Sequence, residues 1–153
     1  DEPFTLASGK KSNLYFDLRG LSSHADLFSR VVYELSYLMP PYANIMGVAT
    51  AGIPLATSLA TFLHKPFGYV RSESKDHGTK SLVEGGLNKY TPLVVVDDVV
   101  STGGSLIKAI HTLREQGYVV ERAICVVDRG MGGSEALNAI GVDLKSLMSM
   151  NDV

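Results

Sequence analysis

The sequence predicts an α/β fold with a largely parallel sheet flanked by helices, on the basis of two patterns. Short apolar runs that are typical of buried strands alternate along the chain with segments of helical periodicity. The run from Leu93 to Val96 is a continuous series of mostly branched residues, which a parallel sheet buries on both faces. No repeat or linker divides the 153 residues, so we expect residues 1–153 to form a single domain.

The first half of the chain predicts three strands and two helices. Ser23, followed three residues later by Asp26, resembles a capping box, and apolar residues at helical spacing continue from there until Pro40. A second helix should begin after a turn at 50–52 and run to about His64. The expected strands are 14–18, 45–49 and 67–70.

The second half predicts a long loop followed by further strands and helices. Residues 71–88 are polar, contain glycine and show no regular period, which is typical of a functional lid or of a disordered segment, and a solvated charged loop is the alternative interpretation. The strand at 93–96 should end at Asp97-Asp98, and the following helix should be closed by a left-handed Gly117. The remaining elements are expected as a strand over 119–127, a helix over 134–140 and a strand over 142–147.

Composition excludes several classes of protein. The formal net charge is −2 and the pI is about 6.1, without the basic excess that is typical of nucleic-acid-binding proteins. No apolar run is long enough to span a membrane. The single cysteine, Cys125, rules out an intramolecular disulfide and favours a reducing compartment, so we expect a cytosolic protein. The histidines have no metal-ligand spacing.

The strongest chemical signal is the segment from Asp97 to Ser105. Adjacent carboxylates at the end of a buried strand repel each other, and a sugar diol with Mg²⁺ nearby would offset that cost. The following small residues, from Ser101 to Ser105, allow backbone N–H groups to converge on a phosphate at a helix N-terminus. A simple helix cap with a glycine turn is the alternative interpretation. The chain contains no P-loop motif.

This segment resembles the phosphoribosyl-diphosphate (PRPP) signature of the type I phosphoribosyltransferases. Other motifs along almost the whole chain are similar to those of the orotate phosphoribosyltransferases, namely 4–12, 52–56, 71–78 and 126–129. The resemblance implies a type I phosphoribosyltransferase fold with a flexible catalytic lid and a small N-terminal hood. The family usually begins with a helical segment ahead of the hood, and we expect this segment to be absent before Phe4.

The resemblance also implies an activity, in which orotate and PRPP give orotidine 5′-monophosphate and diphosphate with Mg²⁺ as cofactor. Mg²⁺ would be held mainly by PRPP and water rather than by protein ligands. The ribose hydroxyls would bind Asp97 and Asp98, and the diphosphate would lie along the turn at 50–52. The implied PRPP-binding residues are Thr50, Ala51, Gly52, Asp97, Asp98, Val99, Val100, Ser101, Thr102, Gly103, Gly104 and Ser105, together with three lid residues, Arg71, Lys75 and His77.

The lid residues and Asp98 are implied to be catalytic. Positive groups on Arg71, Lys75 and His77 would stabilise charge on the departing diphosphate, and Lys75 is expected to be the most sensitive position. In the family the lid reaches into the neighbouring subunit, which implies a homodimer with two composite sites.

For orotate, the resemblance implies contacts to Ser101, Arg129, Tyr15 and Phe16. A surface ion pair for Arg129 and core packing for the two aromatic residues are the alternatives. Three positions that are often basic in the family are uncharged here, namely Ala7, Ala51 and Ser72. A phosphoribosyltransferase for another base and a PRPP-sensing regulator of the same fold are the competing hypotheses.

Overall fold

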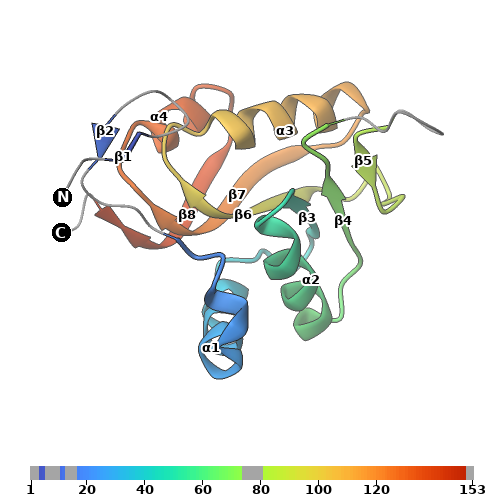
Figure 1. Ribbon diagram of the computed structural model, residues 1–153. Coiled ribbons are helices and arrows are strands. Elements are labelled where there is room, and N and C mark those ends of the chain that lie inside the picture. Colours follow the sequence, from blue (N-terminus) through green and yellow to red (C-terminus); the bar gives the residue numbers. More distant parts are fainter. Residues whose placement is uncertain (1–3, 6–10, 13–16, 74–80, 151–153) are drawn as a thin grey trace.

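In the residues that the structure describes, the main sheet has six strands in the order β5-β4-β3-β6-β7-β8 (Figure 1). The structure is a computed structural model, and it describes residues 4–5, 11–12, 17–73 and 81–150. Strands β4, β3, β6, β7 and β8 run parallel, and β5 pairs with β4 in the antiparallel direction. The strands are β3 (Asn44–Val48), β4 (Phe67–Val70), β5 (Val83–Glu84), β6 (Leu93–Val100), β7 (Val120–Asp128) and β8 (Asp143–Ser149). The predicted α/β fold with a largely parallel sheet is confirmed.

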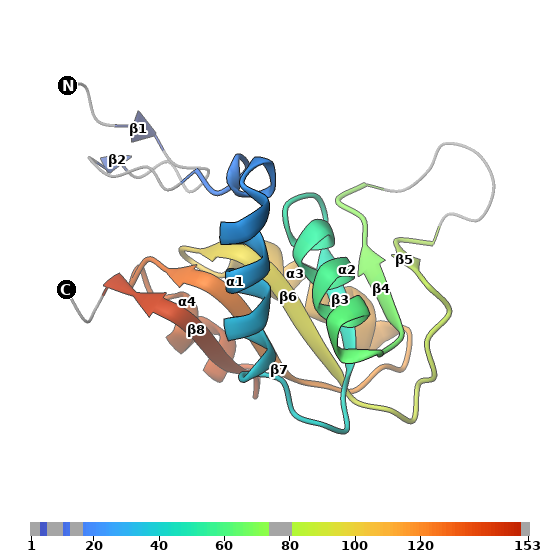
Figure 2. The ribbon, with the colours of Figure 1, turned by 90° about the horizontal axis from the view of Figure 1, so that it is seen from below.

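Two pairs of helices cover the two faces of this sheet (Figures 1 and 2). Helices α1 (Ala25–Ser36) and α2 (Gly52–Leu63) lie on one face, and α3 (Gly104–Glu115) and α4 (Gly133–Asn138) lie on the other. No helix in the described part of the chain combines the length and the apolar character that crossing a membrane requires.

Each face of the sheet has its own hydrophobic core, and β6 contributes to both. Val94 and Val96 pack with α1 and α2, whereas Leu93 and Val95 pack with α3 and α4, as the alternation of side chains along a strand requires. Cys125 of β7 is fully buried in the second core, and burial raises the pKa of its thiol. The central strands therefore pack helices on both faces.

The structure corrects two predicted boundaries. Ser23 does not cap α1, because it lies in a short 3₁₀ helix (Leu21–Ser23) and its hydroxyl donates to the Gly20 carbonyl, while His24 occupies the N-cap position. Asp97-Asp98 does not end β6, which continues to Val100. The reason is that β7 is long enough to pair with this extension, up to the Val100 and Asp128 pair.

The N-terminal residues and the long loop also differ from expectation. The predicted strand at 14–18 falls largely outside the described residues, and its last two positions are not in a strand. Ahead of it, β1 (Phe4–Thr5) and β2 (Lys11–Ser12) form a separate antiparallel pair at the position expected for the hood (Figure 2). The segment 71–88 is not wholly irregular, because β5 returns along the edge of the sheet. The sequence did not predict β5, because a strand of two residues is too short to show a pattern.

Gly52, the first residue of α2, lets the helix approach the centre of the sheet. A Cβ atom at this position would lie 2.3 Å from the Val96 carbonyl oxygen and 3.2 Å from the Cα of Asp97. Both of those atoms belong to the backbone of β6 and cannot move aside as a flexible side chain could. Glycine at position 52 therefore sets how closely the turn after β3 approaches the end of β6.

We expect Gly52→Ala to lower the free energy of unfolding by about 1–3 kcal/mol, because the added methyl group would force the backbones of α2 and β6 apart. Urea unfolding followed by circular dichroism would measure this loss. Gly20→Ala is the matched control, since a Cβ atom there would have no neighbour within 4 Å and the backbone φ is already −77°. Equal effects of the two substitutions would contradict the close approach.

Candidate active site

The predicted site residues gather where the order of the strands changes direction. The chain leaves β3 to form β4 on one side and returns to form β6 on the other, so β3 and β6 are neighbours although they are not consecutive. Ligands of open α/β sheets bind at such a point, beyond the carboxyl ends of the strands. The turn at 50–52 follows β3 and the segment 97–105 includes the end of β6, so both predicted motifs lie there.

The end of β6 and the loop after it surround a first cavity of about 310 Å³. All but one of the residues predicted to hold PRPP in this segment line it, namely Asp97, Val99, Val100, Ser101, Thr102, Gly103, Gly104 and Ser105. Gly103 has a φ of +80°, a conformation that favours glycine, and it directly precedes α3. The loop thus leads into a helix N-terminus, which favours anions. We call this the cradle cavity.

A second glycine, at the start of α4, supports the back of the cradle. A Cβ atom on Gly133 would lie 2.6 Å from Cγ1 of Val100 and 2.7 Å from the Ser101 carbonyl oxygen. The loop after β6 therefore packs directly against the α4 backbone. The sequence analysis did not identify this residue, because nothing in the local pattern around 133 indicates that another loop packs on it.

Asp97 and Asp98 point toward different faces of the sheet. Asp97 lines the cradle cavity on the α3 side, and Asp98 lines a second cavity on the side of α1 and α2. The Asp98 N–H donates to Oδ1 of Asp97 at 2.9 Å, and the Val99 N–H donates to Oδ1 of Asp98 at 2.7 Å. The two carboxylates are therefore held in place by the backbone and stand on either side of the strand.

Burial makes ionisation of Asp97 costly. Desolvation, followed by the neighbouring charge of Asp98, raises the pKa of Asp97 to about 8 from its usual value of 3.8. No ion pair of Asp97 with a basic side chain occurs among residues 17–73 and 81–150. A buried acid that lacks a cation, beside a second carboxylate, suits a ligand that brings positive charge or hydroxyl donors.

The second cavity, of about 450 Å³, lies between the start of α1, the start of α2 and Asp98. Its walls are mostly apolar and include Leu18, Phe28 and Leu55, with Thr50 and Ala51 of the predicted diphosphate turn at one side. The helical spacing of apolar residues did not predict that Phe28 and Leu55 line a cavity. The periodic pattern identifies an apolar face but cannot show where that face lacks a partner.

A third and smaller cavity, of about 140 Å³, lies where the predicted lid begins. It is lined by Ala49, Arg71, Ser72, Ser105 and Lys108, among others. Arg71 directly follows β4, its backbone N–H donates to the Leu82 carbonyl at 2.8 Å, and its guanidinium pairs with Glu84 of β5 at 3.3 Å. Pairing with β5 therefore fixes the position of Arg71.

Of the remaining predicted site residues, the structure describes only Arg129. The Arg129 N–H donates to the Val100 carbonyl at 2.8 Å, so Arg129 lies beside the end of β6, one strand away from the two aspartates. Its half-buried side chain belongs to neither of the two larger cavities. Tyr15, Phe16, Lys75 and His77 lie outside the described residues.

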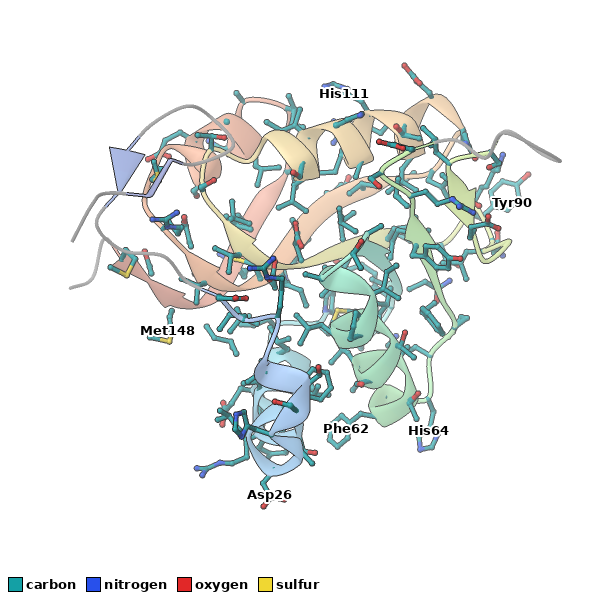
Figure 3. The ribbon with its side chains drawn as sticks, in the orientation of Figure 1. Asp26, Phe62, His64, Tyr90, His111 and Met148 are labelled. Atoms are coloured by element: carbon teal, nitrogen blue, oxygen red, sulfur yellow. The ribbon has the colours of Figure 1, made fainter. Side chains whose placement is uncertain are left out.

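Metal binding by the protein alone has no support in the described part of the chain. It contains no group of three or more His, Cys, Asp or Glu side chains that could hold an ion. His64, which follows the last residue of α2, and His111 of α3 both point outward (Figure 3). The oxygen donors of Asp97 and Asp98 suit Mg²⁺ if a ligand supplies the other oxygens.

The raised pKa of Asp97 predicts a pH dependence of stability. The folded state binds this proton more tightly than the unfolded chain, so the contribution of Asp97 is fully present below about pH 4 and is lost as the pH rises through about 8. Asp97→Asn should therefore stabilise the protein more at about pH 8 than at about pH 5, by at least 1.4 kcal/mol, the equivalent of about one pKa unit. Urea unfolding at the two pH values measures the difference.

Asp98→Asn provides the comparison for this experiment. It removes the second cause of the shift while leaving Asp97 buried, so it should remove part of the pH dependence and not all of it. A stabilisation by Asp97→Asn that is the same at both pH values would contradict the raised pKa.

Known proteins are similar to this chain in both sequence and architecture. A phosphoribosyl transferase domain model matches residues 43–139. An orotate phosphoribosyltransferase from Sulfolobus acidocaldarius is 41% identical, over 98% of this chain and 77% of the relative. The crystal structure of orotate phosphoribosyltransferase from Aeropyrum pernix has a TM-score of 0.83 and 42% identity, over 98% of this chain and 86% of that one. Leishmania donovani UMP synthase has a TM-score of 0.88 and 32% identity, over 98% of this chain and 33% of that one. The domain match and the 41% identity over most of both chains show that the chain belongs to the orotate phosphoribosyltransferases, within the phosphoribosyltransferase family.

Proposed function

We propose that the protein transfers the 5-phosphoribosyl group of PRPP to orotate, which yields orotidine 5′-monophosphate and diphosphate for pyrimidine biosynthesis. The observation that carries the proposal is the cradle cavity, which Asp97 shares with the loop from Ser101 to Ser105 at the switch point of the sheet. Membership of the family supports the choice of orotate as the acceptor.

The cradle cavity holds the 5′-phosphate, and the two aspartates hold the ribose. Backbone N–H groups at the start of α3 face the phosphate and the helix dipole favours its charge. Asp97 and Asp98 stand on opposite sides of β6, so the ribose ring lies across the end of this strand, with one hydroxyl toward each carboxylate. The diphosphate extends from there toward the turn at 50–52.

Bond breaking at the anomeric carbon develops positive charge on the sugar and negative charge on the diphosphate. Arg71, Lys75 and His77 stabilise the departing diphosphate, and a preorganised donor of this kind contributes about 3–4 kcal/mol to the transition state. Asp98 stabilises the developing sugar cation. A closed lid also keeps water from capturing the cation in place of orotate.

Orotate is a planar anion and needs both a flat apolar surface and a positive group. The mostly apolar cavity beside Asp98 offers that surface. Arg129, which lies beside the end of β6 and outside that cavity, is proposed to supply the positive group for the orotate carboxylate. Ser101, Tyr15 and Phe16 complete the contacts to the base. Orotate binds from the α1 and α2 side of β6, opposite the phosphate.

Mg²⁺ and a reducing environment complete the proposal. When bound through PRPP and water, Mg²⁺ supplies charge neutralisation for the diphosphate, next to Asp97 and Asp98. A cytosolic location is consistent with the one cysteine, Cys125, being a buried free thiol.

Incubation with PRPP and Mg²⁺ together with orotate, uracil, adenine or hypoxanthine, in parallel, tests the proposed reaction. We expect only orotate to be consumed, with stoichiometric release of diphosphate. Consumption of a purine base alone would overturn the orotate assignment. Binding of PRPP without reaction of any base would instead favour a PRPP-sensing regulator.

A homodimer in which each lid completes the partner's site is part of this proposal.

Lys75→Ala should lower turnover about 10²–10³-fold and change PRPP affinity much less, because the lysine acts mainly on the transition state. Equal losses in turnover and in affinity would assign Lys75 to ground-state binding.

Mixing two inactive variants tests whether the lid is shared. A hybrid of one Lys75→Ala subunit and one Asp98→Asn subunit would contain one site with both defects and one site with neither. We expect activity to reappear on mixing, at up to about half the normal rate per hybrid dimer. Absence of recovery, after subunit exchange is demonstrated by mass spectrometry, would contradict a lid that acts across the dimer.

A further inference from the structure

We propose that Lys108, on α3, binds the diphosphate group of PRPP from the third cavity. The inference rests on the proposed function and adds a residue outside every motif that the sequence analysis identified. It starts from the cations that line the three cavities described above, which are Arg19, Arg71 and Lys108.

Among these three cations, Lys108 differs in having no acidic partner. Arg19 pairs with Asp17 at 2.8 Å, and Arg71 pairs with Glu84 at 3.3 Å. Lys108 forms no ion pair with the described residues, 17–73 and 81–150. Its charge is therefore available to an anionic ligand without the loss of an internal ion pair.

The face of α3 that carries Lys108 begins at the cradle. Ser105, Lys108, Ala109 and Thr112 all line the third cavity, and their spacing places them on one side of the helix. The neighbouring side of the helix, with Leu106, Ile110 and Leu113, is buried in the core. Ser105 lines both the cradle and the third cavity, and Lys108 lies three residues, about 4.5 Å, further along the axis.

The other walls of the third cavity come from the segments proposed to meet the diphosphate. Ala49 directly precedes the turn at 50–52, and Arg71 and Ser72 begin the lid. Lys108 thus faces a space between the diphosphate turn, the start of the lid and the phosphate cradle. A group that extends from a ribose at the end of β6 toward the turn lies within reach of this space.

The charges in this region explain why a lysine on α3 would be needed. Positions 51 and 72 are alanine and serine in this chain, so neither the turn nor the residue after Arg71 supplies a cation. Arg71 is partly neutralised by Glu84. A diphosphate carries several negative charges, and a lysine ammonium serves as a compact point charge for phosphate oxygens.

We assign Lys108 to the diphosphate and not to the 5′-phosphate of PRPP, because the two groups would occupy different cavities. The cradle cavity has no cation in its lining, and it binds phosphate through backbone N–H groups. Lys108 lines the neighbouring cavity on the far side of Ser105. A ligand that carries the 5′-phosphate but lacks the diphosphate should therefore not depend on Lys108.

Binding measurements on the full chain separate these possibilities. Isothermal titration calorimetry would use inorganic diphosphate with Mg²⁺, PRPP with Mg²⁺, and orotidine 5′-monophosphate as the three ligands. We expect Lys108→Met to weaken diphosphate and PRPP binding about tenfold, as loss of one hydrogen bond to a charged group predicts. Affinity for orotidine 5′-monophosphate should stay within about twofold, and Lys108→Arg should retain most of the diphosphate affinity.

Lys145→Met is the matched control, because Lys145 is an exposed lysine on β8, at the opposite edge of the sheet, and its loss changes the net charge equally. Lys108 is exposed, so both variants should fold, and their thermal unfolding would show it.

Each outcome bears on the inference in a different way. Unchanged diphosphate binding in Lys108→Met would overturn it, and so would an equal loss of orotidine 5′-monophosphate affinity. Equal losses in Lys108→Met and Lys145→Met would reduce the effect to net charge and also overturn it. In these cases the proposed function stands as long as the unsubstituted protein transfers phosphoribose to orotate. If the unsubstituted protein binds neither PRPP nor diphosphate, the proposed function and the inference both fail.

Discussion

The site depends on the parallel pairing of β3 with β6. The register that pairs Gly47 with Val96 brings the turn at 50–52 beside Asp97, and Gly52 permits contact with the β6 backbone. The two loops meet because both follow the carboxyl ends of neighbouring strands. A helix pair on each face then closes the site from opposite sides, so the cavities at this point differ in chemistry.

The division between the two faces follows from the alternation of side chains along β6. Asp97 faces α3 and the cradle cavity, whereas Asp98 faces the apolar cavity between α1 and α2. Burial beside a second carboxylate raises the pKa of Asp97, which is a cost to the folded state. A ligand that brings hydroxyl donors or positive charge would offset this cost, so ligand binding and the pKa of Asp97 would be linked.

Local patterns predicted much of the fold and part of the site. The branched run at 93–96, the helical spacing in α1 to α3 and the left-handed Gly117 are all confirmed, because short-range periodicity and backbone sterics act within a few residues. Most of the predicted cradle residues line one cavity for the same reason, since they are consecutive. The roles of Lys75, His77, Tyr15 and Phe16 stay predictions, since these residues lie outside the described part of the chain.

The sequence by itself determined the alternation of strands and helices, the pair of carboxylates after the branched run at 93–96 and the small-residue loop that follows. The tertiary structure decided that β6 continues past Asp98, because β7 supplies hydrogen-bonding partners there. It also decided that β5 fixes Arg71, that Gly133 supports the cradle and that Lys108 faces the start of the lid. These features join residues far apart in the chain, and only the packing of one element on another brings them together.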